Sequence, residues 1–459
     1  MRAVAALTEL WQLAQLPDAA LPYARLPGSD PVLPSSFCVG SAAQSTIAAA
    51  ALAACELGHA RGAARQQVQV DMAHAALECR SWFSLDGVSP EPWDKFSGLY
   101  ACADGWVRIH ANFAHHRDGA LRLLALDPAS AGRADAEQAM RSWRAIDFET
   151  AAANAGLVAS ALRSFAQWDA SAQGPAVAAQ PLFTIERIGT AAPLDLPVLG
   201  ADARPLQGIR VLDLTRILAG PVGTRAMAAY GADVLMVNAP HLPNIEAIAD
   251  TSRGKLSAHA DLRTAPGQDA LWRVVSDAQV FVQGYRPGAL PALGFGPVEL
   301  AARRPGIVVV SLSAYGPEGP WSGRRGFDSL VQTAMGFNHA EGQAKGDGKP
   351  RPLPMQILDH ASGYLIAFCA AAALLRQQRE GGSWHVRISL AQTGHWLRRL
   401  GRVENGFGVA PPDHTPYLER SVSGFGELLA LRHSAELART PAKWVLPSMP
   451  PGSHAMRWP

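Results

Sequence analysis

The sequence is poor in charged residues, and the two signs almost cancel. Only 17% of its 459 residues are Asp, Glu, Lys or Arg, and the formal net charge at pH 7 is +2. A chain so close to neutral gives no electrostatic reason to expect nucleic acid or an acidic membrane as a partner. Hydrophobic residues make up 48%, which excludes a disordered chain, and the length predicts about two to four domains.

Cysteine is also scarce. The five cysteines are scattered and never form a CxxC pair: Cys38, Cys55, Cys79, Cys102 and Cys369. We therefore expect neither a disulfide framework nor a zinc site, and no metal is predicted. The N-terminus lacks the features of a signal peptide, and the Ala-rich run 46–55 is too short to span a bilayer. These absences favour a soluble cytoplasmic protein without a membrane partner.

Three common motifs are missing as well. No GxGxxG follows the apolar run 209–214, which argues against a dinucleotide site, and no GxxxxGK[ST] phosphate loop occurs. The GxSxG elbow is absent too, so the sequence does not support an acyl-CoA hydrolase of the α/β-hydrolase kind.

What the sequence does contain is a regular alternation that begins at Pro205. A strand at 209–214, a turn of small residues and a helix at 222–230 open it. Further strands are predicted at 234–237, 279–282, 307–312 and 386–390, and further helices at 266–276, 297–303, 362–378 and 391–400. This alternation predicts a parallel, doubly wound sheet with ligand-binding loops at the carboxyl ends of its strands.

The chain outside this region divides by composition. We expect an N-terminal extension (1–35), a small α+β domain (36–190), a linker (191–204), the sheet domain (205–400) and an irregular tail (401–459). Within the small domain, Trp93–Ile109 reads as a hairpin that turns at Ala103-Asp104-Gly105.

One internal echo crosses these boundaries. At a constant offset of 318 residues, Ser41–Ala75 lies over Asp359–Thr393, and both stretches read helix, strand, helix. The identities are few and mostly Ala, so composition alone could produce them. If the repeat is real, Ser41 occupies the place of Asp359.

Seven ordered segments between 205 and 400 resemble the family III CoA-transferases, the group that includes formyl-CoA, carnitine and bile-acid CoA-transferases. They are PLQGIRVLDLTRILAGP, YGADVLMV, SRGKLSAHADLR, VQGYRPGALPALGFG, RPGIVVVSLSAYGPEGPW, RRGFDSLVQ and LPMQILDHASGYLIAFCAAAALL. The resemblance implies an α/β fold with a Rossmann-like sheet domain, and a homodimer. FSGLYACADGWVRIH resembles the family's small domain, and Leu428–His454 resembles its usual chain end. Since the small domain normally follows the sheet domain, the domain order is rearranged here.

The resemblance implies that Asp359 is the nucleophile that attacks an acyl-CoA thioester. A carboxylate suits this task because it is ordinarily ionised near pH 7 and needs no external base. Free N–H groups at the start of a helix would orient and stabilise it. The alternative is structural, because an Asp just before a helix is most often only an N-cap.

The resemblance also implies CoA contacts in the loops at the strand ends. They are assigned to Arg216, Ala219, Lys255, Arg286, Gly288 and Arg325. Arginine and lysine can pair with phosphate oxygens, and glycine allows close backbone approach. For each Arg taken singly, a solvated surface charge is the alternative. Acyl-CoA and a carboxylic acid are then substrates, and no permanently bound cofactor is expected.

Several positions depart from the family pattern and keep two other functions open. Leu256 and Asn238 replace residues usual at those places, which leaves a non-catalytic acyl-CoA-binding homologue as one alternative. The other alternative is an acyl-CoA racemase or isomerase. Related racemases have a His where this chain has Phe327, next to Asp328, so racemisation is disfavoured unless His360 substitutes.

A cluster of three histidines, His110, His115 and His116, has no metal-binding spacing. We expect these side chains to be surface or packing residues.

Overall fold

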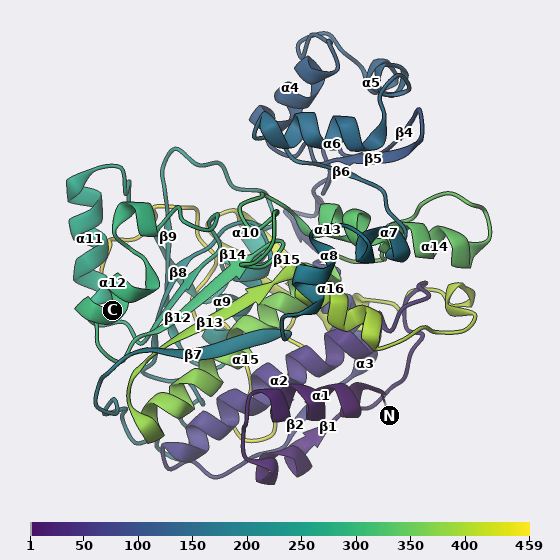
Figure 1. Ribbon diagram of the computed structural model, residues 1–459. Helices are drawn as coiled ribbons and strands as arrows, with labels where there is room; N and C mark the ends of the chain where they lie inside the picture. Colours follow the sequence, from purple (N-terminus) through teal and green to yellow (C-terminus); the bar gives the residue numbers. More distant parts are fainter. Residues whose placement is uncertain (1) are drawn as a thin grey trace.

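A computed structural model describes residues 2–459, and a seven-stranded sheet forms its centre (Figure 1). The strand order is β10-β9-β8-β11-β12-β13-β7. Every neighbouring pair is parallel except β13 and β7, which are antiparallel. The strands are β7 Phe183–Gly189, β8 Arg210–Leu214, β9 Asp233–Asn238, β10 Lys255–His259, β11 Val280–Gln283, β12 Val308–Ser313 and β13 Ser383–Ser389. The α/β fold with a Rossmann-like parallel sheet is thus confirmed.

Helices cover both faces of this sheet. The central strands β8, β9, β11 and β12 are largely apolar because successive side chains point to opposite faces and both faces are buried. Val280 belongs to one hydrophobic core, for example, and the next residue, Phe281, belongs to the other. The first core also contains α2 Val39–Ala60, α9 Ala219–Ala229 and α15 Ile357–Glu380; the second contains α11 Ala265–Val275 and α12 Pro297–Arg303.

The order of the strands creates a crevice at β8. From β8 the chain builds outward through β9 and β10, then returns to place β11 on the other side of β8. The loops that follow β8 and β11 therefore leave the sheet in opposite directions. Ligands of open α/β sheets bind at such a switch point, outside the carboxyl ends of the strands.

The long helices α2 and α15 pack side by side and form the centre of the larger core. Both are rich in alanine, which lets their backbones come close together. By length and composition α15 could cross a membrane, but 94% of its most apolar window is buried inside the protein. Such burial is typical of a core helix.

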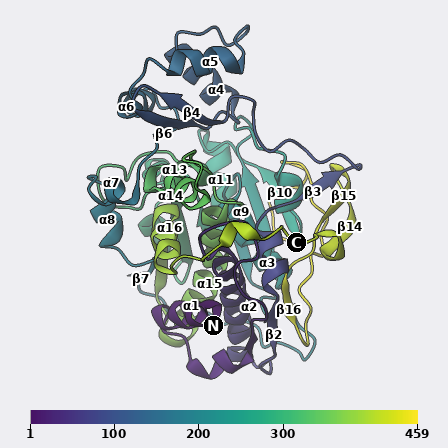
Figure 2. The same ribbon diagram turned by 90° about the vertical axis from the view of Figure 1, so that its right-hand side faces the viewer.

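The stretch 36–190, expected to form one small domain, is divided among several cores. A separate core holds β4 Gly98–Cys102, β5 Gly105–Ile109, β6 Ala159–Ala161, α4 Ala114–Leu123, α5 Arg133–Met140 and α6 Ala145–Asn154. These elements form the small domain, which stands at one end of the molecule (Figure 2). The predicted hairpin is confirmed, since β4 and β5 pair around the turn 103–105. In contrast, α2 packs in the main core and β7 is an edge strand of the main sheet.

The sequence suggested an irregular tail after residue 401, but the structure shows three strands in it. β14 Leu418–Ser423 and β15 Gly426–Leu431 form a sheet with β3 Phe83–Leu85, and β16 Ala435–Leu437 pairs with β2 Val68–Val70. A buried carboxylate fastens this contact, because Glu78 on α3 (Met72–Glu78) accepts hydrogen bonds from the Ser434 backbone and from Tyr364, each at 2.8 Å. Residues 418–437 are thus held against residues 68–85.

Candidate functional site

A cavity of about 390 Å³ opens at the switch point of the sheet. Its walls come from the loops after β8, β11 and β12, from the first turn of α15, and from small-domain residues near the start of α4. A volume of this size is typical of small-molecule sites. The sheet domain thus supplies the floor, and the small domain supplies part of the cover.

Asp359 lies in the wall of this cavity. The structure excludes the N-cap interpretation, because the N-cap position of α15 is Gln356 and Asp359 is three residues further on, inside the first turn. Within residues 2–459, the Asp359 carboxylate forms no hydrogen bond or ion pair with the protein. Its oxygens are therefore free to meet a ligand.

The start of α15 is capped by a different acid, Asp328 of α13 (Asp328–Met335). Its carboxylate accepts the backbone N–H of Asp359 at 2.9 Å and also interacts with the N–H of Leu358. Gln332, one turn along α13, donates its amide to the other carboxylate oxygen. Asp328 is completely buried, so this contact is shielded from water.

Burial and mutual repulsion govern the ionisation of these two acids. Burial raises the pKa of Asp328 to about 7, although the N–H groups of Asp359 and Leu358 and the Gln332 amide act in the opposite direction. Burial, and then the charge of Asp328, raise the pKa of Asp359 well above its usual range. Only Asp328 has donors that stabilise its anion, so we expect it to ionise first.

Four arginines also line the cavity. Arg216, Arg286 and Arg325, all predicted from the sequence to contact CoA, line it together with Arg324. Arg325 donates to the carbonyl of Gly156 in the small domain at 3.1 Å, which fixes its position. Four arginines and one carboxylic acid in the same lining make a cavity suited to a polyanion.

Two further sequence assignments fall differently in the structure. Ala219, the first residue of α9, lines the cavity. Gly288 does not line it, although its left-handed conformation (φ 85°) shapes the loop between the lining residues Pro287 and Ala289.

Lys255 is fully buried, so it does not reach the cavity. Its ammonium donates to the Asp213 carboxylate at 2.9 Å, to Thr224 at 2.7 Å and to the Pro221 carbonyl at 2.9 Å. A lysine with three protein partners has no free donor for a ligand. Its position under the loop 215–221 instead supports the cavity floor, which spacing along the sequence could not reveal.

The small domain contributes residues that sequence reasoning missed. Phe113, His115 and His116 all line the cavity. His116 is only 5% exposed, and neither of its ring nitrogens has a hydrogen-bond partner within residues 2–459. Burial, His115 and Arg325 lower the pKa of His116 to about 4, so the ring is neutral at pH 7. The available signal was the cluster of histidines, which we had expected to be surface or packing residues.

Phe327 is held in this same wall. Its ring stacks on His110 with centroids 3.9 Å apart and an angle of 9° between the planes. His360 lies elsewhere, since its Nε2 is 2.7 Å from the Ser81 hydroxyl and burial lowers its pKa to about 3. It is not among the cavity residues, so it does not replace the missing histidine.

The two departures from the family pattern also lie outside the cavity. Leu256 packs against the second hydrophobic core, and the Asn238 amide oxygen accepts a hydrogen bond from Asn244. Neither substitution therefore changes the lining of the site.

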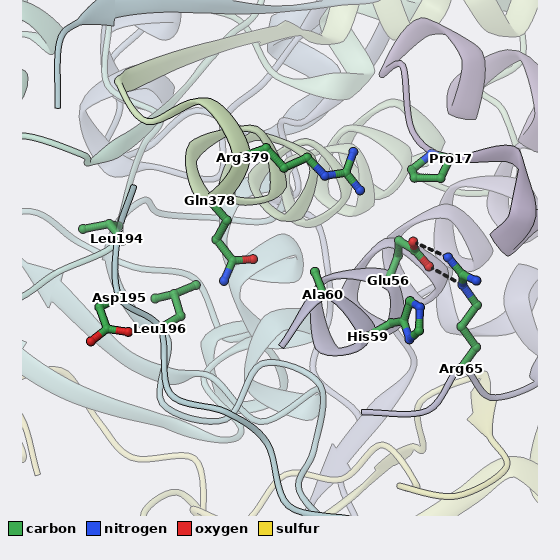
Figure 3. Close-up of a pocket in the computed structure, with 10 residues that line it drawn as sticks. All are labelled: Pro17, Glu56, His59, Ala60, Arg65, Leu194, Asp195, Leu196, Gln378 and Arg379. Carbon is green, nitrogen blue, oxygen red and sulfur yellow. Dashed lines mark hydrogen bonds and ion pairs between the residues drawn. The ribbon is translucent and has the colours of Figure 1, made fainter. Parts of the chain in front are cut away.

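A second cavity, of about 620 Å³, lies between the C-terminal ends of α2 and α15 (Figure 3). It contains Arg379, which is about 30 Å along the helix from Asp359 at 1.5 Å per residue. Its buried acid, Glu56, is already neutralised by two hydrogen bonds of 2.8 Å from Arg65. Glu56 is therefore not available as a nucleophile.

Comparison with known proteins identifies the sheet domain. Residues 206–400 match the family model described as CoA-transferase family III. An acyl-CoA transferase of Gibberella moniliformis is 31% identical over 379 residues, which cover 73% of this chain and 66% of that protein. A probable fatty acyl-CoA transferase of Mycobacterium tuberculosis is 35% identical over 202 residues, covering 41% and 51%. A succinate–glutarate CoA-transferase of Agrobacterium fabrum is 31% identical over 242 residues, covering 46% and 60%.

The matches cover only part of each relative. This chain spans between about half and two thirds of the length of these three proteins.

Proposed function

The chain belongs to the family III CoA-transferases through residues 206–400, and on this basis we propose that it transfers CoA from an acyl-CoA to a carboxylic acid. The observation that supports the proposal most is the composition of the cavity. One acid without a protein partner, Asp359, and four arginines line the same space at the switch point of the sheet. A thioester that carries phosphates needs both a nucleophile and a cationic cradle.

In the proposed reaction, a carboxylate oxygen of Asp359 attacks the thioester carbonyl. The C–S bond breaks, CoA leaves as a thiolate, and a mixed anhydride forms between Asp359 and the acyl group. The thiolate then attacks the aspartyl carbonyl, which releases the donor acid and leaves an aspartyl-CoA thioester. The acceptor carboxylate reverses these steps and departs as its CoA ester. Each exchange is easier than direct transfer between two acids.

Arg216, Arg286 and Arg325 are proposed to hold the phosphates of CoA while this exchange takes place. The apolar lining beside Asp359, which includes Leu218, Phe327 and Leu390, would exclude water from the anhydride.

Trapping the intermediate tests the proposal. The protein is incubated with succinyl-CoA or a fatty acyl-CoA and then with hydroxylamine, and the peptide that contains Asp359 is analysed by mass spectrometry. A hydroxamate at Asp359, together with CoA transfer to glutarate or a fatty acid, supports the proposal. CoA binding with no adduct for any donor would contradict it and favour a non-catalytic acyl-CoA-binding protein.

A second measurement separates transfer from racemisation. Incubation of a branched acyl-CoA in deuterated water, without an acceptor acid, should introduce no deuterium at Cα. Phe327 supplies no acid or base at the position where related racemases have a His. Deuterium wash-in that persists without an acceptor would support the racemase instead.

A further inference from the structure

Asp328 and Asp359 share the first turn of α15 in an unusual way. The free N–H groups of a helix N-terminus normally attract the nearest carboxylate of their own segment. Here Asp328, 31 residues earlier in the chain, accepts the Asp359 N–H at 2.9 Å. Since this place is occupied, the Asp359 side chain receives no hydrogen bond from its own helix.

The first turn of α2 provides an internal reference. Asp30 accepts the N–H groups of Gly40 and Ser41, both at 3.0 Å. These are the second and third residues of α2, as Leu358 and Asp359 are of α15. The capping device is therefore the same in both helices. The third residue differs, because the Ser41 hydroxyl donates to its cap Asp30 at 2.6 Å, whereas Asp359 cannot donate as a carboxylate.

We propose that Asp328 is a positioning residue for Asp359: by occupying the N–H groups of the first turn, it keeps the Asp359 carboxylate unpaired and available in the cavity. This inference rests on the proposed function, in which Asp359 attacks the thioester. An anion without hydrogen bonds is a stronger nucleophile than one held by several donors, because less stabilisation is lost when it reacts.

The charges around the pair bear on a separate property, the pH at which Asp359 loses its proton and becomes a nucleophile. Arg108, on β5 of the small domain, is the cation whose charge acts on Asp328. On the other side of Asp359 lie the cavity groups Arg216, Arg286, Arg324, Arg325 and the neutral His116. The charge of Asp328 acts together with burial to keep the proton on Asp359 at a pH where an ordinary aspartate is ionised.

Two substitutions of Asp328 divide its roles. Asp328→Asn keeps an oxygen that accepts the Asp359 N–H but removes the charge. Asp328→Ala removes both. Asp30→Asn and Asp30→Ala are the matched controls, because they make the same change at the cap of α2.

The first measurement requires no catalysis. A water-soluble carbodiimide and an amine label protonated carboxyl groups, and mass spectrometry of the Asp359 peptide follows labelling against pH. In Asp328→Asn, labelling of Asp359 should disappear at lower pH than in the unaltered protein, because a neighbouring negative charge has been removed. The Asp30 variants should leave this profile unchanged. An identical profile in Asp328→Asn, or an equal displacement in Asp30→Asn, would overturn the proposal.

The second measurement is the transfer reaction itself. For Asp328→Ala we expect kcat to fall about 100-fold with little change in KM, because the nucleophile is no longer held in place. The rising part of the pH–kcat profile should move to lower pH in Asp328→Asn. If Asp328→Ala lacks a cooperative thermal unfolding transition, Asp328→Asn alone decides. If the unaltered protein forms no acyl adduct, the proposed function fails. The labelling experiment still shows whether Asp328 controls Asp359, because it does not depend on catalysis.

Discussion

The first turns of α2 and α15 are alike in construction and unlike in chemistry. Each is capped by a carboxylate from another segment, Asp30 for α2 and Asp328 for α15. The third residue of α2, Ser41, is buried and bonded to its cap, whereas the third residue of α15, Asp359, faces a cavity without a partner. The two helices also begin 318 residues apart, the offset at which the sequence echoes itself.

This difference shows how a structural device can become a reactive one. The Ser41 hydroxyl donates to Asp30, so the first turn of α2 is stabilised and presents no reactive group. Asp359 adds a second acid beside an acid that already occupies the best donors, which is unfavourable in the free protein. Proteins retain such local conflicts mainly where function requires them. The comparison therefore supports the assignment of the chemistry to α15.

Removal of the Asp359 carboxylate should have the largest effect. We expect Asp359→Ala to lower kcat for CoA transfer by about 10⁴-fold or more, because the covalent route is lost. Ser41→Ala, the corresponding change in α2, should leave kcat within about threefold, since Ser41 lies outside the cavity. Steady-state transfer rates measured by chromatography of the CoA esters check this, and comparable losses in both variants would contradict the division of roles.

A second contrast concerns the cavities at the two ends of α15. Within residues 2–459, three arginines of the cavity at Asp359, among them Arg216, form no ion pair with a carboxylate, whereas Arg65 in the distant cavity is neutralised by Glu56. Arg216→Ala should weaken CoA binding by about 10- to 100-fold, the value of one or two charge-assisted hydrogen bonds. Arg65→Ala should not change it. Calorimetric titration with CoA gives both constants, and equal weakening would place the binding elsewhere.

Small-domain residues and the first turn of α15 line the same cavity. Substitution of His116 tests whether the small domain takes part in acyl-CoA binding. His116→Phe removes two unpartnered ring nitrogens from the cavity wall, and we expect kcat/KM for acyl-CoA to fall about tenfold. His259 is exposed and does not line the cavity, so His259→Phe serves as the control. If both variants lose activity equally, the effect is one of general packing rather than of a hydrogen bond.

The large sheet domain was accessible from the sequence for simple physical reasons. Its strands are buried on both faces and read as apolar runs, and its loops fall at the strand ends that a parallel sheet must bring together. β10 and β7 were missed, because KLSAH is weakly apolar and FTIERIG alternates like an exposed edge strand. Edge and short strands carry the weakest periodic signal.

The site could be predicted in part for the same reason. Five of the seven assigned residues, Arg216, Ala219, Arg286, Arg325 and Asp359, lie in one cavity because they follow neighbouring strands or face the loops after them. Lys255 could not be placed, since a buried and an exposed lysine look alike in sequence. Asp328 and His116 depend on contacts between segments distant along the chain, which no local pattern encodes.

The smallest expected effect is one of stability, and it converts the end of α15 into a copy of the end of α2. In Asp359→Ser, the new hydroxyl can donate to Asp328 as Ser41 donates to Asp30. The substitution also replaces a buried acid beside Asp328 with a neutral side chain. Mainly because this acid is removed, we expect a gain in the free energy of unfolding of about 1–2 kcal/mol at pH 7, with transfer activity lost. The measurement is urea denaturation of the two proteins at several pH values.

The pH dependence of that gain tests its cause. The folded pKa of Asp359 is raised above the ordinary value of about 3.9, so its contribution to stability is complete below that pH and is lost as pH rises toward the folded pKa. The advantage of Asp359→Ser should therefore be small near pH 3 and should grow toward pH 7. A gain that is the same at every pH would instead come from the serine hydrogen bond, and Asp359 would then not be a strained acid at all.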